Sequence, residues 1–165
     1  MGFSIKSLKT PLRYPGGKSR ACKKMDPYIP DLRDYDSYYE PFLGGGSVAI
    51  HITKKYPHLK INVSDLYEPL YNFWVCLQKR GEEMAGELKK LKSSHSTPDL
   101  AKELFLESKK IINDEDKGRV DRAIAFYIVN KCSFSGLTES SSFSKQASNS
   151  NFTLRGITKL PAYQE

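Results

Sequence analysis

The three consecutive glycines at positions 44–46 are the feature of this sequence that points most directly to a ligand-binding site. They follow a predicted short strand at residues 38–43 and precede an apolar helical run that begins near Ser47. Glycine lets the backbone turn sharply and approach a ligand closely. The start of a helix directs free N–H groups and its positive dipole end into the same space. The pattern therefore predicts a turn that binds the anionic or polar end of a cofactor, although such a turn can also simply connect two elements.

A carboxylate follows the glycines at a spacing that suits the same kind of ligand. Asp65 ends a second predicted strand at residues 60–64, about twenty residues after the glycines, where dinucleotide-binding folds hold a ribose. Strand, helix and strand form a β-α-β unit, which requires parallel strands and binds ligands at their carboxyl ends. Asp65 could instead only cap the next helix. Upstream, residues 13–18 (Arg-Tyr-Pro-Gly-Gly-Lys) form another backbone-permissive turn, which carries an aromatic ring and a cation.

At these three places the sequence resembles the Dam-like (D12 class) family of S-adenosylmethionine-dependent DNA adenine-N6 methyltransferases. Members carry an aromatic-Pro/Ala-Gly-Gly-Lys segment, then Glu-Pro-Phe-x-Gly-x-Gly, then a strand that ends in Asp, and all three are present here in this order. The resemblance implies an α/β chain with a partial Rossmann-like methyltransferase fold and S-adenosylmethionine as its cofactor. The cofactor-binding residues that it implies are Tyr14, Lys18, Glu40, Pro41, Phe42, Gly44, Gly46 and Asp65.

The resemblance continues after a predicted helix at residues 119–131. Family members have an Asn-x-x-x-aromatic-x-Gly-Leu segment here, and residues 130–137 match it, although relatives often have Asn in place of Ser135. That departure leaves the role of Ser135 open. In the family this segment leads into a loop or hairpin of the target-recognition domain, so double-stranded DNA is the implied partner. The DNA-contacting residues expected around it are Lys131, Ser135, Lys145 and Arg155. An ordinary surface linker is the alternative interpretation of the Ser/Asn-rich stretch that follows.

The family's catalytic segment, Asp-Pro-Pro-Tyr, is not found in this sequence. N6 methylation needs the adenine outside the duplex, with its amino group held by acceptors, which that segment supplies in relatives together with a stacking aromatic. Residues 26–28 (Asp-Pro-Tyr) lack the second proline and precede the cofactor strand. We therefore assign no catalytic residue. We expect either the N-terminal portion of a longer enzyme or one piece of a split enzyme that needs a complementary C-terminal segment. The alternative function is a DNA- or cofactor-binding module without catalysis.

A nucleotide-hydrolysing P-loop is a weaker alternative. Residues 17–19 (Gly-Lys-Ser) match the end of G-x-x-x-x-G-K-[ST]. The first glycine of that motif, however, would fall at Leu12, and no strong apolar strand precedes it. We therefore reject ATP as the ligand.

Length and composition limit the number of domains, the kind of partner and the cellular location. The 165 residues have room for one domain, or for one domain with a small insertion. The 26 Lys and Arg residues against 19 Asp and Glu give a net charge of +7, which is compatible with a nucleic-acid partner. Three widely spaced cysteines and three histidines show neither disulfide nor metal-ligand spacing, so we predict no metal and a reducing, cytoplasmic location. The sequence shows no signal peptide and no apolar run near the ~18 residues of a membrane span.

The remaining spacing predicts a mainly helical second part. Helices are expected at residues 19–25, after the glycines as far as Tyr56-Pro57, from residue 68 onward, on both sides of a loop at 93–98, and at 119–131. A flexible loop at 138–151 and a final strand at 152–157 are expected to follow. The expected organisation is a cofactor-binding part at residues 1–80, a helical target-recognition insertion at 81–157, and a return to the methyltransferase domain at 158–165.

Overall fold

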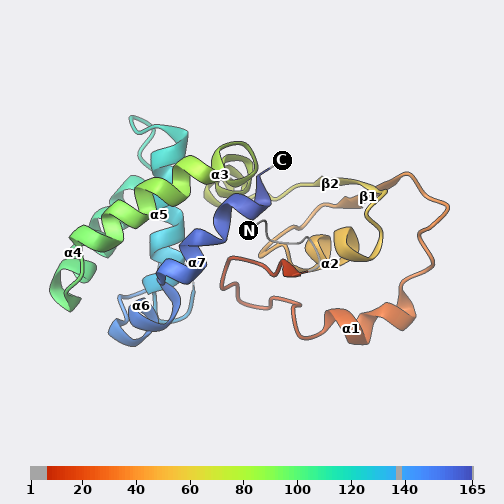
Figure 1. Cartoon of the computed structure of the whole chain (residues 1–165), viewed down its shortest axis with the longest axis horizontal. Helices are drawn as coiled ribbons and strands as arrows, with labels where there is room; N and C mark the ends of the chain where they lie inside the picture. The colour runs from red at the N-terminus through yellow and green to blue at the C-terminus, as the bar shows by residue number, and fades with distance from the viewer. Residues whose placement is uncertain (1–6, 137–138, 165) are drawn as a thin grey trace.

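The computed structural model describes residues 7–136 and 139–164, so Leu137 of the family-like segment and the first residue of the expected loop lie outside the described residues. In chain order the elements are α1 (Cys22–Met25), η2 (Asp26–Tyr28), β1 (Ser37–Glu40), α2 (Ser47–Lys55), β2 (Lys60–Val63), α3 (Glu68–Ser94), α4 (Pro98–Ile111), α5 (Arg119–Cys132), α6 (Lys145–Asn151), α7 (Leu154–Thr158) and η3 (Leu160–Tyr163). Figure 1 shows a helical part formed by α3 to α7 beside a smaller part that contains β1, α2 and β2.

The two strands form a small parallel sheet. In their register Ser37 is opposite Lys60 and Glu40 is opposite Val63. The helix α2 connects the strands, as the predicted β-α-β unit requires, and begins directly after the glycines. The parallel pairing confirms the expected order of this unit and fits the α/β class.

A separate small core holds α2 against the sheet. Ile52 of α2 is fully buried and packs with Tyr56 and Leu59, and the partly buried Ile61 of β2 joins them. The helix ends at Lys55, two residues before Pro57, because proline disfavours a helical backbone at the residue before it. Hydrophobic spacing and a breaker residue thus determine both ends of this unit.

The helical part is built around α5. Every residue of α5 from 123 to 130 is buried, which is typical of a helix surrounded by others. It packs against both α3 and α4. The apolar residues of α3 recur at helical spacing and form a stripe that packs into this core. The fully buried members of that stripe are Leu70, Phe73, Leu77, Met84 and Leu88.

The helix α3 runs without a loop through the expected boundary between residues 80 and 81. Arg80 has non-helical backbone angles (φ −140°, ψ 33°), so the helix is kinked there. Gly81 permits a close approach at this kink, because a Cβ added to it would lie 3.2 Å from the carbonyl oxygen of Leu160. The C-terminal residues therefore pack directly onto α3.

The expectations for residues 138–157 are wrong in two places. Instead of a flexible loop ending at 151 and a strand at 152–157, the chain forms α6 and α7. Each helix is capped by a hydroxyl: Ser144 Oγ accepts from the Ala147 N–H and Thr153 Oγ1 accepts from the Gly156 N–H, both at 3.1 Å. Serine and threonine at these positions start short helices, and burial of Phe152 in the helical core stabilises them.

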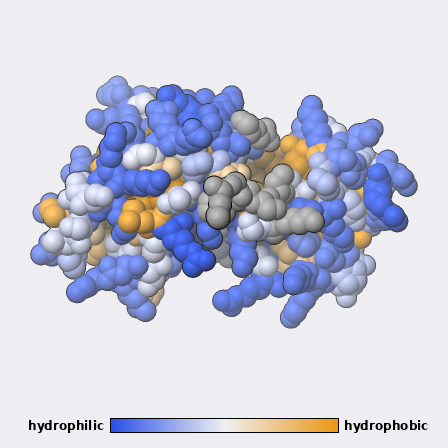
Figure 2. Space-filling view, in the orientation of Figure 1, coloured by the Kyte–Doolittle hydropathy of each residue, from blue (hydrophilic) through white to orange (hydrophobic). Residues whose placement is uncertain are grey.

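Most of the face seen in Figure 2 is hydrophilic, with hydrophobic side chains gathered in small patches. Within residues 7–136 and 139–164, no helix has the length and apolar character needed to cross a membrane.

Candidate functional site

A cavity of about 220 Å³ opens beside the glycine turn, at the carboxyl end of β1 and the start of α2. Five of the predicted cofactor-binding residues line it: Tyr14, Lys18, Glu40, Phe42 and Gly44. The other three, Pro41, Gly46 and Asp65, do not line it. The structure thus brings the two predicted turns, at residues 13–18 and 41–46, together around one cavity.

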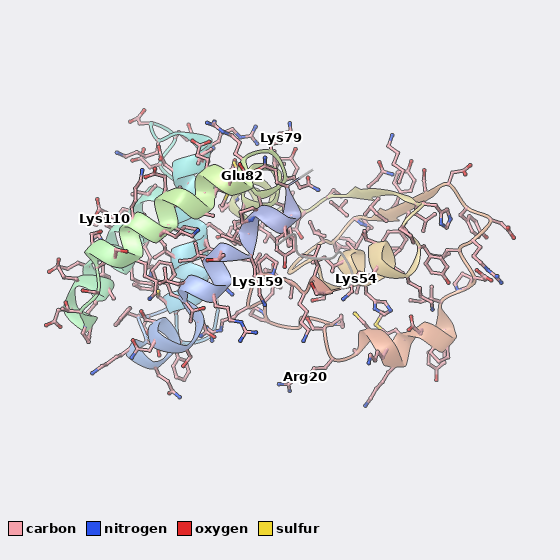
Figure 3. All side chains as sticks on the ribbon, viewed as in Figure 1. Arg20, Lys54, Lys79, Glu82, Lys110 and Lys159 are labelled. Carbon is pink, nitrogen blue, oxygen red and sulfur yellow. The ribbon has the colours of Figure 1, made fainter. Side chains whose placement is uncertain are left out.

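An adjoining cavity of about 290 Å³ extends the site. It shares Tyr14 and Ser47 with the first cavity and reaches Thr10 and Arg20. The side chain of Arg20, labelled in Figure 3, extends away from the ribbon. Small-molecule sites typically occupy ~300–1,000 Å³, and the two adjoining cavities together reach that range.

Two aromatic rings explain why the turn consists of glycines. Gly46 has φ +71°, and a Cβ added to it would lie 2.6 Å from Cζ2 of Trp74. The Trp74 Nε1–H also donates a hydrogen bond to the Gly44 carbonyl at 3.2 Å. Trp74 belongs to the apolar stripe of α3 and was not predicted as a site residue, so its contact with the turn is a new finding. Its tertiary position left no local signal in the sequence.

The ring of Tyr14 lies against the other side of the turn. A Cβ added to Gly44 would lie 3.2 Å from Cε1 of Tyr14, and one added to Gly45 would lie 2.8 Å from its Cβ. Burial, and then the nearby charge of Asp65, raise the pKa of the Tyr14 hydroxyl. The Tyr14 ring is thus a neutral aromatic wall of the cavity.

Asp65, two residues after the end of β2, holds the glycine turn by a hydrogen bond. Its Oδ2 accepts a hydrogen bond from the Gly44 N–H at 2.9 Å, and its Oδ1 accepts one from the Tyr67 N–H at 3.1 Å. The N-cap position of α3 is occupied by Tyr67, whose side chain makes no capping hydrogen bond, and not by Asp65. A carboxylate has about four acceptor positions, so these two bonds leave capacity for a ligand.

Glu40 is a half-buried carboxylate in the wall of the cavity. Burial raises its pKa, while hydrogen bonds from the Tyr38 hydroxyl, at 3.3 Å, and from the backbone of Ala49 act in the opposite direction. Burial and the Glu40 carboxylate raise the pKa of Tyr38 to about 12. A carboxylate with incomplete solvation is a favourable site for a ligand cation.

The turn at residues 13–18 is closed by its own hydrogen bonds. The Gly17 N–H donates to the Tyr14 carbonyl at 3.0 Å, and Lys18 Nζ donates to the Gly16 carbonyl at 2.6 Å. Lys18 is exposed at the rim of the cavity. Its ammonium group is therefore accessible to an anionic ligand.

The predicted DNA-contacting residues lie in the helical part. Ser135, Lys145 and Arg155 are exposed, whereas Lys131 is partly buried, with its Nζ 5.4 Å from the centre of the Tyr127 ring. Burial, followed by the charge of Arg13, lowers the pKa of Lys131 to about 8. Lys131 is therefore the least accessible of the four.

Sequence reasoning did not identify the pairing of Arg13 with Asn130. The Arg13 N–H donates to Asn130 Oδ1 at 3.0 Å, and Asn130 Nδ2 donates to the Arg13 carbonyl at 2.6 Å. The side chain of Asn130 is fully buried. Gly136 has φ +76°, and a Cβ there would lie 2.9 Å from the Arg13 carbonyl oxygen. The available signal was the polar Asn130 directly after the run of apolar residues at 123–129 of α5.

Within the described residues, no three His, Cys, Asp or Glu side chains are grouped so that they could hold a metal ion.

Comparison with known proteins identifies the family of the chain. The family model of D12 class N6 adenine-specific DNA methyltransferases matches residues 14–162. The chain is 27% identical over 137 residues to a protein named Type II methyltransferase M.MjaIII from Methanocaldococcus jannaschii. This match covers 79% of the chain and 47% of the relative, so the chain spans about half the length of that protein. The resemblance stated from the motifs is confirmed: the chain belongs to the family of D12 class N6 adenine-specific DNA methyltransferases.

Proposed function

We propose that this chain is the cofactor-binding and target-recognition part of a site-specific DNA adenine-N6 methyltransferase that uses S-adenosylmethionine. The observation that carries the proposal is the cavity between the two turns, which combines an aromatic wall, a half-buried carboxylate and a backbone of glycines. We further propose that β1, α2 and β2 belong to a Rossmann-like sheet. In this proposal residues 81–157 serve target recognition, and residues 158–165 return toward the methyltransferase domain.

The residues around the cavity fit the groups of S-adenosylmethionine. The half-buried carboxylate of Glu40 suits the ammonium of the methionine end, and Lys18 at the rim suits its carboxylate. Asp65 does not line the cavity but bonds to Gly44, which does, and it retains acceptor capacity for ribose hydroxyls. The Tyr14 ring offers an apolar wall. When bound, the cofactor supplies an activated methyl group. The protein residues bind and orient it.

The partner that we propose is double-stranded DNA. The chain has a net charge of +7, and the exposed Lys145 and Arg155 belong to two short helices that follow the family-like segment. If both side chains contact phosphates, removing them should weaken DNA binding and flatten its dependence on salt. We expect Lys145→Met/Arg155→Met to reduce the slope of log affinity against log salt by about 2. An unchanged slope would exclude phosphate contacts by these residues. Lys23→Met/Lys24→Met on α1, which lies outside residues 81–157, is a charge-matched control.

The acceptors for the adenine amino group are proposed to come from a second polypeptide segment, because this sequence contains no Asp-Pro-Pro-Tyr. The part of the chain near the cavity exposes large apolar side chains that such a segment would cover: Tyr39 is 72% exposed, Phe42 86% and Leu66 100%. In the described sheet each strand pairs only with the other, so each also offers an outer edge for pairing.

A labelled-methyl transfer assay on adenine-containing duplexes tests the proposal. The chain alone should bind S-adenosylmethionine in a calorimeter but transfer no label. Addition of a segment that carries Asp-Pro-Pro-Tyr, fused or in trans, should restore transfer. Robust incorporation by the chain alone would contradict the proposed incompleteness. Cofactor binding without recovery in the presence of the segment would favour a non-catalytic binding module.

A further inference from the structure

We propose that Arg13 is a positioning residue that couples the cofactor cavity to the base of the hairpin after α5. The hairpin base consists of Ser133, Phe134, Ser142 and Phe143. This inference rests on the proposed function, because it concerns the same cavity and the same recognition segment. In this inference Arg13 contacts neither the cofactor nor the DNA, and it acts by positioning the residues that do.

The hairpin base is a short antiparallel pairing. Ser133 and Phe143 form an isolated antiparallel bridge, and the Phe134 N–H donates to the Ser142 carbonyl at 3.0 Å. This pairing leaves the carbonyls of Ser133 and Phe134 to accept hydrogen bonds from a group outside the hairpin. Phe134 itself is 77% exposed, so its side chain contributes little burial to hold the segment in place.

Arg13 supplies the hydrogen bonds on that outer side. Its Nη1 donates to the Ser133 carbonyl at 2.7 Å, and its Nη2 donates to the Phe134 carbonyl at 3.1 Å. A guanidinium is a rigid fork, so two bonds to successive carbonyls fix both the position and the direction of the strand. The side chain of Arg13 thus pairs with the hairpin base as a neighbouring strand would.

The backbone of the same residue is fixed to the helical part. Asn130 accepts from the N–H of Arg13 and donates to its carbonyl, and Gly136 approaches that carbonyl closely. Tyr14 follows directly in the chain, and its ring lies on Gly44 and Gly45 in the cavity wall. A ligand that fixes the Tyr14 ring therefore also restricts the backbone from which the Arg13 guanidinium extends.

The physical consequence is coupling between the two sites. A ligand that fills the cavity orders residues 13 and 14, so the hairpin base becomes more rigid. DNA that contacts the hairpin base then causes a smaller further loss of conformational entropy. Coupling between two ligand sites typically corresponds to ~5–150-fold in affinity.

Amide hydrogen exchange at the hairpin base measures this coupling without DNA. The probe ligand is S-adenosylhomocysteine, and its binding is measured separately by calorimetry. In the wild-type chain, saturation should slow exchange of the Phe134 amide by about fivefold or more. In Arg13→Met the ligand should still bind, but this slowing should fall below about twofold. Arg13→Lys should restore part of it, because an ammonium can reach one carbonyl but lacks the fork.

The matched control is Arg33→Met, which removes the same charge from an exposed residue that pairs with Asp31 in the loop before β1. It should retain the full effect. Arg13→Met should remain folded, because the Tyr67 hydroxyl still donates to Glu139 at 3.1 Å and ties the hairpin to α3. Equal slowing in wild type and Arg13→Met, or no slowing in a wild-type chain that binds the ligand, would overturn the inference. Absence of ligand binding to the wild-type chain would instead contradict the proposed function on which it rests.

Discussion

The carboxylate of Asp65 holds the backbone of Gly44, because its Oδ2 accepts a hydrogen bond from the Gly44 N–H at 2.9 Å. Its other oxygen accepts from the Tyr67 N–H, so one side chain ties the glycine turn to the start of α3. A residue predicted for cofactor binding therefore also stabilises the turn. The two contributions can be separated by mutation.

Asp65→Ala should weaken binding of S-adenosylmethionine at least tenfold, because loss of a charged hydrogen-bond acceptor costs ~1.5–3 kcal/mol. The free energy of unfolding should also fall by about 1–2 kcal/mol, because the Gly44 N–H loses its partner. Asp65→Asn retains an oxygen acceptor for that N–H, so it should lose affinity with a smaller loss of stability. Calorimetry and urea unfolding measure both quantities. An unchanged affinity in folded Asp65→Ala would remove this residue from the site.

Gly46→Ala should lower the free energy of unfolding by about 2–5 kcal/mol. A left-handed backbone costs a Cβ-bearing residue ~1–2 kcal/mol, and overpacking against Trp74 adds ~1–3 kcal/mol. The control is Gly86→Ala on the exposed side of α3, where an added Cβ meets nothing within 4 Å. That change should stabilise the chain by about 0.5–1 kcal/mol. Similar unfolding midpoints for the two variants would refute the close contact at Gly46.

Glu40→Gln should move stability and cofactor affinity in opposite directions. The pKa of Glu40 is raised by folding, so its ionised form costs stability once the pH exceeds the ordinary pKa of a glutamate. The Gln variant should therefore be more stable than wild type at pH 7, and the difference should disappear as the carboxyl of the wild type becomes protonated at low pH. Cofactor binding at pH 7 should weaken several-fold. Tighter or equal binding by Glu40→Gln would argue against an ammonium partner.

Lys131→Met should reveal the cost of burying a cation. The pKa of Lys131 is lowered from its ordinary value of 10.5 to about 8, so between these pH values the unfolded chain binds a proton that the native chain lacks. Wild-type stability should thus rise relative to the Met variant as the pH increases from 8 to 10.5. Denaturant unfolding across this range, with Lys145→Met as an exposed control, measures the trend. A constant difference between wild type and Lys131→Met would mean that the lysine is fully solvated.

The local features of the chain were determined by its sequence. Apolar spacing and the proline at position 57 predict the β-α-β order, and the stripe of α3 predicts a buried helical face. These features depend on periodicity and on backbone restrictions, which act over a few residues. The same local character explains why two turns, at residues 13–18 and 41–46, could be proposed as ligand-binding from the sequence alone, and both line one cavity in the structure.

Only the tertiary structure decided how distant segments meet. Arg13 pairs with Asn130 across 117 residues, and Trp74 packs on Gly46, yet neither contact leaves a pattern in neighbouring residues. Burial of Lys131 beside Arg13 follows from the same packing. Residues 144–158 form helices against a sequence-based expectation of loop and strand, because burial and two hydroxyl caps outweigh weak local propensity. These contacts and helices form only when many distant residues become ordered together, so their stability depends on the packing of the whole fold and not on neighbouring residues.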